Sequence, residues 1–238
     1  MDYATHIEAV ERETSAFTRA LMRAEADAQV PTCPDWTVRD LAKHVGGVLG
    51  FWSHVLADGT GRPKPQFDDE PGPAAGLWVV QVAGLLINEL KAANADTEVY
   101  TWNPNDHSAG FVARRMAHET AVHRFDAQTA IGKPQAIDSA LAADGIEEIF
   151  VMVDAWPKSG RGDGQTLHLH SAEGNEWLVA MNPDGLDVRR EHAKGDLALR
   201  GAVSDLELLL YDRPPIGEVE RLGDESVLDA WYRVFKFG

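Results

Sequence analysis

The sequence contains a single cysteine, Cys33, among its 238 residues. One cysteine excludes an internal disulfide framework and any zinc site built from several thiolates. Basic residues are also scarce, since 22 lysines and arginines stand against 38 aspartates and glutamates, which gives a formal net charge of −16. Nucleic acids and anionic membranes bind clustered lysine and arginine side chains. The acidic balance therefore argues against both as partners.

Long apolar runs are missing as well. The apolar stretches are interrupted before they reach the length of a membrane span. The first residues, Met1-Asp2-Tyr3, lead into a charged amphipathic segment rather than the apolar core of a signal peptide. We therefore expect a cytoplasmic protein. A chain of this length can bury a sizeable core as one large domain or two small ones. The sequence does not determine the oligomeric state, and a monomer is compatible with it.

Helical periodicity dominates the first half of the chain. Thr37 is a good N-cap residue, and Asp40 occupies the capping-box position three residues later, so a helix should begin there. A loop rich in glycine, proline and aspartate is expected over residues 57–76. The other predicted helices cover about residues 5–29, 74–93 and 108–131. Four amphipathic helices of similar length predict a four-helix bundle.

The pattern changes after Gly132. Alternating segments separated by turn residues predict antiparallel hairpins, and helical segments flank them. The predicted strands are 166–170, 177–181 and 197–201, and the predicted helices are 137–152, 203–211 and 226–235. We therefore expect an all-α four-helix bundle over residues 1–134. A small α+β domain with an antiparallel sheet should occupy residues 135–238.

Three residues of the helical half are candidate metal ligands. Glu119 and His123 lie four apart in a helical run, so they project from the same helix face. His44 falls on the apolar face of the second predicted helix and should point into the core. Two histidines with one glutamate leave coordination positions open, as in catalytic zinc sites. The spacing E-x-x-x-H is weak by itself, and the three side chains could instead form ion pairs or hydrogen bonds with one another.

Other polar residues carry weaker signals. His118 points about 100° away from its neighbour on a helical wheel, so it should lie behind the ligands or at the surface. His168 and His170 would share one face of a strand and could bind a metal, although a solvent-facing hairpin is the simpler expectation. Cys33, in a helix-entry loop, is better explained as a small packing residue than as a catalytic thiol.

Two segments of the helical half resemble a known family. Pro31–His44 (PTCPDWTVRDLAKH) and Phe111–Asp126 (FVARRMAHETAVHRFD) are similar to the metal-binding domain of mycothiol-dependent maleylpyruvate isomerases, members of the DinB-like four-helix bundle superfamily. The segment Leu199–Arg213 is similar to that family's C-terminal domain. The resemblance covers almost the whole chain and implies a DinB-like bundle followed by the family's second domain.

The resemblance also implies a cofactor and a chemistry. Carried over by position, the family's metal ligands fall on His44, Glu119 and His123, the set that the helical geometry selects. The implied metal is zinc (Zn²⁺) or another divalent ion, and the implied cosubstrate is mycothiol, a small thiol. Coordination by a divalent cation makes a thiol a thiolate at neutral pH. The protein then needs no nucleophile of its own.

The implied reaction is a cis–trans isomerisation in which thiolate adds to the double bond of maleylpyruvate, an electrophilic substrate. A mycothiol S-transferase would need the same ligands, and so would a non-catalytic module that binds metal or thiol. The family also places an arginine near its active site, at Arg213, although Asp212 stands where the family has glycine. Arg115 is a second candidate for a substrate carboxylate, and it could equally pair with Glu119 one turn away.

Overall fold

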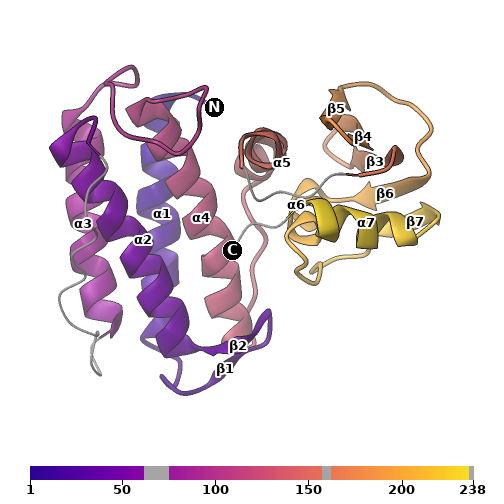
Figure 1. Cartoon of the computed structure of the whole chain (residues 1–238). Helices are drawn as coiled ribbons and strands as arrows, with labels where there is room; N and C mark the ends of the chain where they lie inside the picture. The colour runs from indigo at the N-terminus through magenta and orange to yellow at the C-terminus, as the bar shows by residue number, and fades with distance from the viewer. Residues whose placement is uncertain (62–74, 157–161, 236–238) are drawn as a thin grey trace. The chain divides into compact units, whose positions relative to one another are not determined.

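The computed structural model describes residues 1–61, 75–156 and 162–235 (Figure 1). The chain divides into two compact units, Met1–Gln135 and Ala136–Gly238, beside the expected boundary after residue 134. Residues 62–74, which form most of the expected 57–76 loop, lie outside the described residues.

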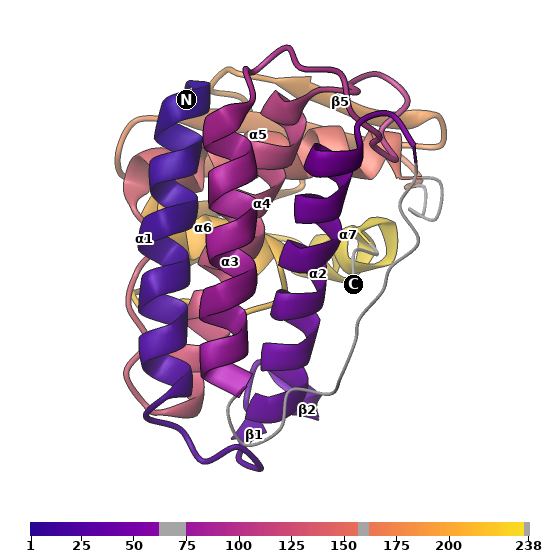
Figure 2. The ribbon, with the colours of Figure 1, turned by 90° about the vertical axis from the view of Figure 1, so that its left-hand side faces the viewer.

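The first unit is built from four long helices and a short hairpin. The helices lie side by side in Figure 2, and each packs against two of the others, α1 on α3 and α4, and α2 on α3 and α4. Their bounds are α1 (Tyr3–Leu21), α2 (Val38–Asp58), α3 (Ala75–Ala92) and α4 (Ala109–Ala130), and the hairpin consists of β1 (Gln29–Val30) and β2 (Cys33–Thr37). This arrangement surrounds the core of the unit with apolar helix faces.

The start of α2 follows the predicted capping box. The Thr37 hydroxyl accepts a hydrogen bond from the Asp40 backbone N–H at 3.2 Å, and the Asp40 carboxylate accepts one from the Thr37 N–H at 2.9 Å. Two backbone donors that the helix leaves unpaired are satisfied in this way. The beginning of α2, and with it the position of His44, is thus determined locally.

The end of α1 differs from the prediction. The helix ends at Leu21, whereas apolar periodicity wrongly extended it to residue 29. Residues Gln29 and Val30 pair antiparallel with β2 instead. The hairpin forms because its backbone hydrogen bonds replace those of a longer helix, and because it buries Val30 completely.

Helix α4 is buried on almost every face. Its polar side chains therefore need partners inside the protein, because an unpaired buried charge is very costly. One such pair joins α4 to α1, where the Arg124 Nε donates to the Glu13 carboxylate at 2.8 Å. The same requirement applies to the candidate metal ligands on this helix.

Helix α3 is long and apolar enough, by length and composition alone, to cross a membrane, and 28% of its apolar window is buried. The expectation that no stretch reaches that length is therefore wrong for α3. One such helix is weak evidence for a membrane span, and α3 packs against α1 and α2. Leu77, Val80 and Leu85 on this helix are exposed.

The second unit is a five-stranded sheet with three helices. Its strand order is β5-β4-β3-β6-β7. The elements are α5 (Ser139–Ala155), β3 (Gln165–Ser171), β4 (Glu176–Asn182), β5 (Gly185–Arg189), β6 (Leu197–Gly201), α6 (Val203–Leu210), β7 (Glu220–Gly223) and α7 (Ser226–Val234).

The predicted antiparallel sheet is mixed. Strands β3 and β6 run parallel, and the other neighbours run antiparallel. The reason is the connection from β5 to β6, residues 190–196, which crosses the sheet because β4 and β3 lie between the two strands. Strand periodicity does not reveal which strands become neighbours, so the sequence could not show this crossing.

Helix α6 ends in a tight cap in which an aspartate takes a conformation that favours glycine. The Arg213 N–H donates to the Leu208 carbonyl at 2.8 Å, and the Asp212 N–H donates to the Leu209 carbonyl at 3.0 Å. Such a cap requires a left-handed residue after the helix. Asp212, at φ 58°, provides it and is the one non-glycine residue with positive φ in the described part of the chain.

We expect Asp212→Gly to raise the free energy of unfolding by up to about 1 kcal/mol, because glycine has no Cβ to disfavour the left-handed conformation. Urea unfolding of the variant and the wild type measures the difference. Asp212→Ala is the control and should not stabilise the protein. A glycine variant less stable than the alanine variant would contradict this explanation of the cap.

Candidate metal centre

Helices α2 and α4 bring the three predicted ligands together. His44 projects from α2, and Glu119 and His123 project from α4. The His44 Nε2 lies 3.0 Å from Glu119 Oε1, and the His123 Nε2 lies 3.3 Å from the same oxygen. One ligand atom of each residue lies within 4.8 Å of those of the other two. Two imidazole nitrogens therefore converge on one carboxylate oxygen.

The second oxygen of Glu119 is held by Arg115. The Arg115 Nη2 donates to Glu119 Oε2 at 2.9 Å, one helical turn away, and both side chains are almost fully buried. The guanidinium therefore directs Oε1 toward the histidines. The structure places Arg115 as the ion-pair partner of Glu119, one of the two roles considered for it.

Asp126 completes the cluster, although the sequence analysis assigned it no role. Its fully buried carboxylate accepts a hydrogen bond from His123 Nδ1 at 2.8 Å. A carboxylate in this position fixes the ring orientation and leaves Nε2 directed at the ligand position. The signal in the sequence was the spacing of His123 and Asp126, three apart on one helix face.

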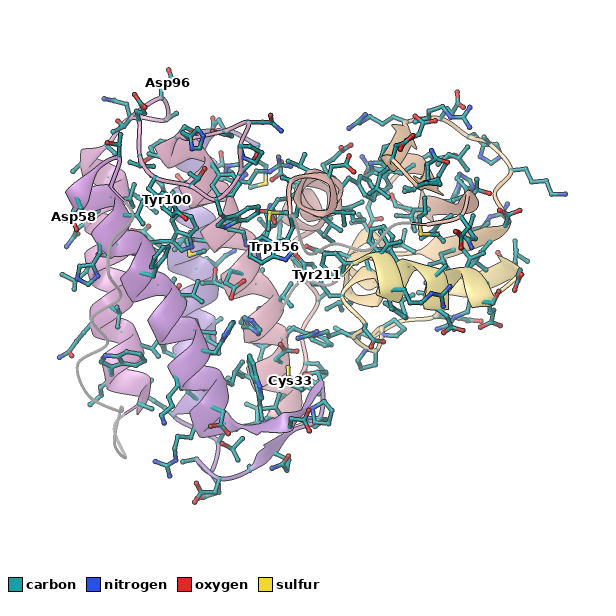
Figure 3. All side chains as sticks on the ribbon, in the orientation of Figure 1. Cys33, Asp58, Asp96, Tyr100, Trp156 and Tyr211 are labelled. Atoms are coloured by element: carbon teal, nitrogen blue, oxygen red, sulfur yellow. The ribbon has the colours of Figure 1, made fainter. Side chains whose placement is uncertain are left out.

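The β1–β2 hairpin supplies two more neighbours. The Trp36 ring lies against the His44 ring, with centroids 4.8 Å apart, and 6.1 Å from the His123 ring. The Cys33 Sγ, labelled in Figure 3, donates to Asp126 Oδ2 at 3.6 Å. The thiol therefore contacts the carboxylate behind His123, and the indole forms a wall beside both imidazoles.

The charges of the cluster are strongly coupled. Burial raises the pKa of Glu119, but attraction to His123, hydrogen bonds from His123 and His44, and the charge of Arg115 hold it well below its usual range. Burial lowers the pKa of His123, but Glu119 and Asp126 outweigh this effect and raise it to about 9. The site thus stabilises a positive charge between two carboxylates. Nitrogen and carboxylate donors around a stabilised positive charge fit a divalent cation.

Two further residues are placed by the structure. Arg213 belongs to the second unit, directly after α6, and its Nη1 donates to the Tyr211 carbonyl at 2.8 Å. Its role near an active site stays a prediction. His118 is fully buried, with its ring centroid 6.2 Å from that of His6, so the idea that it lies at the surface is wrong.

In chelator-treated protein, we expect the His123 imidazole to titrate near pH 9. This pKa of the folded state lies above the ordinary value of 6.5, so the protonated His123 ring stabilises the fold. The stabilisation is complete below about pH 6.5 and is lost as the pH rises through about 9. An NMR titration that follows the ring protons of His123 measures the midpoint of this protonation. Asp126→Asn, which removes one of the two carboxylate charges, should lower it. A midpoint below the ordinary value in the unmodified chain would contradict the described charge balance.

Comparison with known proteins identifies relatives of the helical unit and of the whole fold. Residues 7–128 match the family model described as the mycothiol maleylpyruvate isomerase N-terminal domain. No curated protein matches the chain. A crystal structure of a mycothiol-dependent maleylpyruvate isomerase superposes with a TM-score of 0.65 at 14% identity and covers 93% of each chain. A structure of a histidine-to-alanine mutant of such an isomerase gives 0.60 at 14%, covering 88% of each chain.

At this level of identity the structural likeness establishes the fold alone, whereas the family match covers slightly more than half of the chain. That match spans α2 and α4, and so it includes every residue of the candidate metal centre. The chain therefore belongs to the mycothiol maleylpyruvate isomerase N-terminal domain family.

Proposed function

We propose that this protein is a metal-dependent enzyme that activates mycothiol and uses it for a maleylpyruvate isomerase-like cis–trans isomerisation. The observation that carries the proposal is the convergence of His44 Nε2, Glu119 Oε1 and His123 Nε2 from two helices. The family of the helical unit supports mycothiol as the thiol. In this proposal the four long helices form the DinB-like bundle that the family resemblance implies.

The side chains around the centre have distinct tasks in this proposal. His44 would provide one nitrogen ligand, and His123 would provide another after losing its proton to make room for the cation. Glu119 provides one carboxylate oxygen while Arg115 holds the other. Asp126 keeps the His123 ring in place from behind. Bound zinc would lower the pKa of a coordinated thiol, so that thiolate is available at neutral pH. With only three protein ligands, room remains for such a thiol.

The proposed reaction needs no nucleophile from the protein. The mycothiol thiolate adds to the cis double bond, the resulting single bond rotates, and elimination of the thiolate restores the double bond in the trans form. Atoms and electrons balance because the thiolate that adds also leaves. Arg213 is our candidate for binding a substrate carboxylate, since Arg115 is already paired with Glu119.

We expect His44→Ala to lose one zinc ion per chain relative to the wild type, and thiol binding with it, because a histidine ligand is removed. Metal analysis after dialysis and calorimetric titration with mycothiol measure both. The matched control is His54→Ala, which removes an exposed histidine of the same helix. Unchanged zinc content and thiol binding in His44→Ala would contradict the proposed centre.

With mycothiol and maleylpyruvate supplied, we expect turnover that a chelator abolishes and zinc restores. Asp126→Asn should lower kcat/KM by about 10- to 100-fold, because the hydrogen bond that orients His123 is weakened. An absorbance assay of the substrate measures the rate. Accumulation of a thioether product would indicate the S-transferase instead, and stoichiometric binding without turnover would indicate a non-catalytic module.

A further inference from the structure

The second unit contains a cluster of three histidines and one glutamate that takes no part in the proposed reaction. His168 and His170 lie on β3, Glu176 lies at the start of β4, and His192 lies on the 190–196 connection. One ligand atom of each residue lies within 4.8 Å of those of the other three. We call these four residues the histidine cluster.

Strand register explains how three of the four residues meet. His168 and His170 alternate with Leu167 and Leu169, which are fully buried, so the histidines share the opposite face of β3. Glu176 is the direct cross-strand neighbour of His170 and extends from the same face.

The fourth residue arrives through the crossover. The connection between β5 and β6 must pass over β4 and β3, and His192 lies on it. The His192 ring centroid is 5.3 Å from that of His168 and 5.9 Å from that of His170. The connection therefore crosses on the histidine face of the sheet.

The polar atoms of the cluster converge on the Glu176 carboxylate. The His168 Nε2 lies 3.0 Å from Oε2, the His192 Nδ1 lies 2.7 Å from the same oxygen, and the His170 Nδ1 lies 3.0 Å from Oε1. The His170 Nδ1 is buried and lacks the geometry of a hydrogen bond. One carboxylate is thus shared among three imidazoles, and one of them is left without a well-formed bond.

Burial and ring orientation separate this cluster from a surface hairpin. His168 is 3% exposed, so the expectation of a solvent-facing strand is wrong at this position. The three rings stand steeply to one another, with interplanar angles of 71°, 87° and 83°. Edge-to-face angles are common wherever rings pack together. Here one nitrogen of each ring also lies within 3.0 Å of the Glu176 carboxylate, which apolar ring packing does not require.

We propose that the histidine cluster is a second metal site, which binds a divalent transition-metal cation such as zinc. Three imidazoles and one carboxylate are ligands that zinc accepts, and four protein ligands fill its tetrahedral coordination. A pocket of about 370 Å³ adjoins His168 and His192, so an ion has a path to the site.

Because four protein ligands leave no open coordination position, the ion would have a structural role rather than a catalytic one. Its ligands come from β3, β4 and the 190–196 connection, so the bound cation joins the crossover to the sheet. No residue of this site belongs to the candidate metal centre of the helical unit. The inference therefore goes beyond the proposed function and does not rest on it.

The test uses the full chain carrying His44→Ala, which removes the first centre from the count and leaves His123 in place beside Glu119 and Asp126. After chelator treatment, we expect this variant to bind about one zinc ion per chain, and to give the visible spectrum of tetrahedral cobalt when Co²⁺ replaces zinc. Zinc should also raise its Tm. Adding His170→Ala and His192→Ala should weaken zinc binding by about 100-fold or more and remove both other effects. Adding His54→Ala instead is the control.

Neither His170 nor His192 is fully buried, so the added substitutions should leave the fold intact, which circular dichroism checks. A His44→Ala chain that binds no zinc would overturn the proposal, and so would zinc binding that the added substitutions leave unchanged. Failure of the proposed function gives a different result. If the first centre did not bind zinc, the wild type and this variant would contain equal amounts of zinc.

Discussion

The carboxylate of Glu119 is the constraint on which the helical unit depends. It lies on the most enclosed helix of that unit, where an uncompensated charge would be very costly. Arg115 neutralises one oxygen, and His44 and His123 approach the other. This requirement favours the rotation of α4 that turns Glu119 toward α2, because a different rotation would bury the carboxylate against apolar side chains. The same groups that satisfy the charge form the set of candidate metal ligands.

The short β1–β2 hairpin extends this arrangement. By ending α1 early it brings Cys33 and Trp36 to the end of α4 at which His123 and Asp126 lie. The indole lies beside both imidazoles, and the thiol contacts Asp126, which holds His123. Residues 31–44, one of the two segments that resemble the family, thus contain both the hairpin neighbours and the candidate ligand His44.

The two clusters of the chain follow one physical rule with different outcomes. In each, imidazoles from separate elements converge on a carboxylate, because a partly buried negative charge attracts donors. The helical cluster offers three candidate ligands and has Arg115 and Asp126 behind them, an arrangement suited to the thiol of the proposed function. The histidine cluster offers four ligands and spans a crossover, an arrangement suited to holding chain segments together. The difference lies in ligand number and in the connectivity of the elements rather than in residue type.

The sequence by itself determined what depends on neighbours within one element. The capping box at Thr37, the approximate positions of the long helices, and the Glu119–His123 pair are all set by local spacing. The apolar face of the second helix selected His44, and the family resemblance implies the same residue. Tertiary structure decided which segments meet. It ended α1 at the hairpin, paired β6 with β3 and made the sheet mixed, brought Cys33 to Asp126, and brought His192 to His168. Periodicity shows which side of an element is apolar, but not which other surface will cover it, because that choice depends on the burial and hydrogen bonding of the whole chain at once.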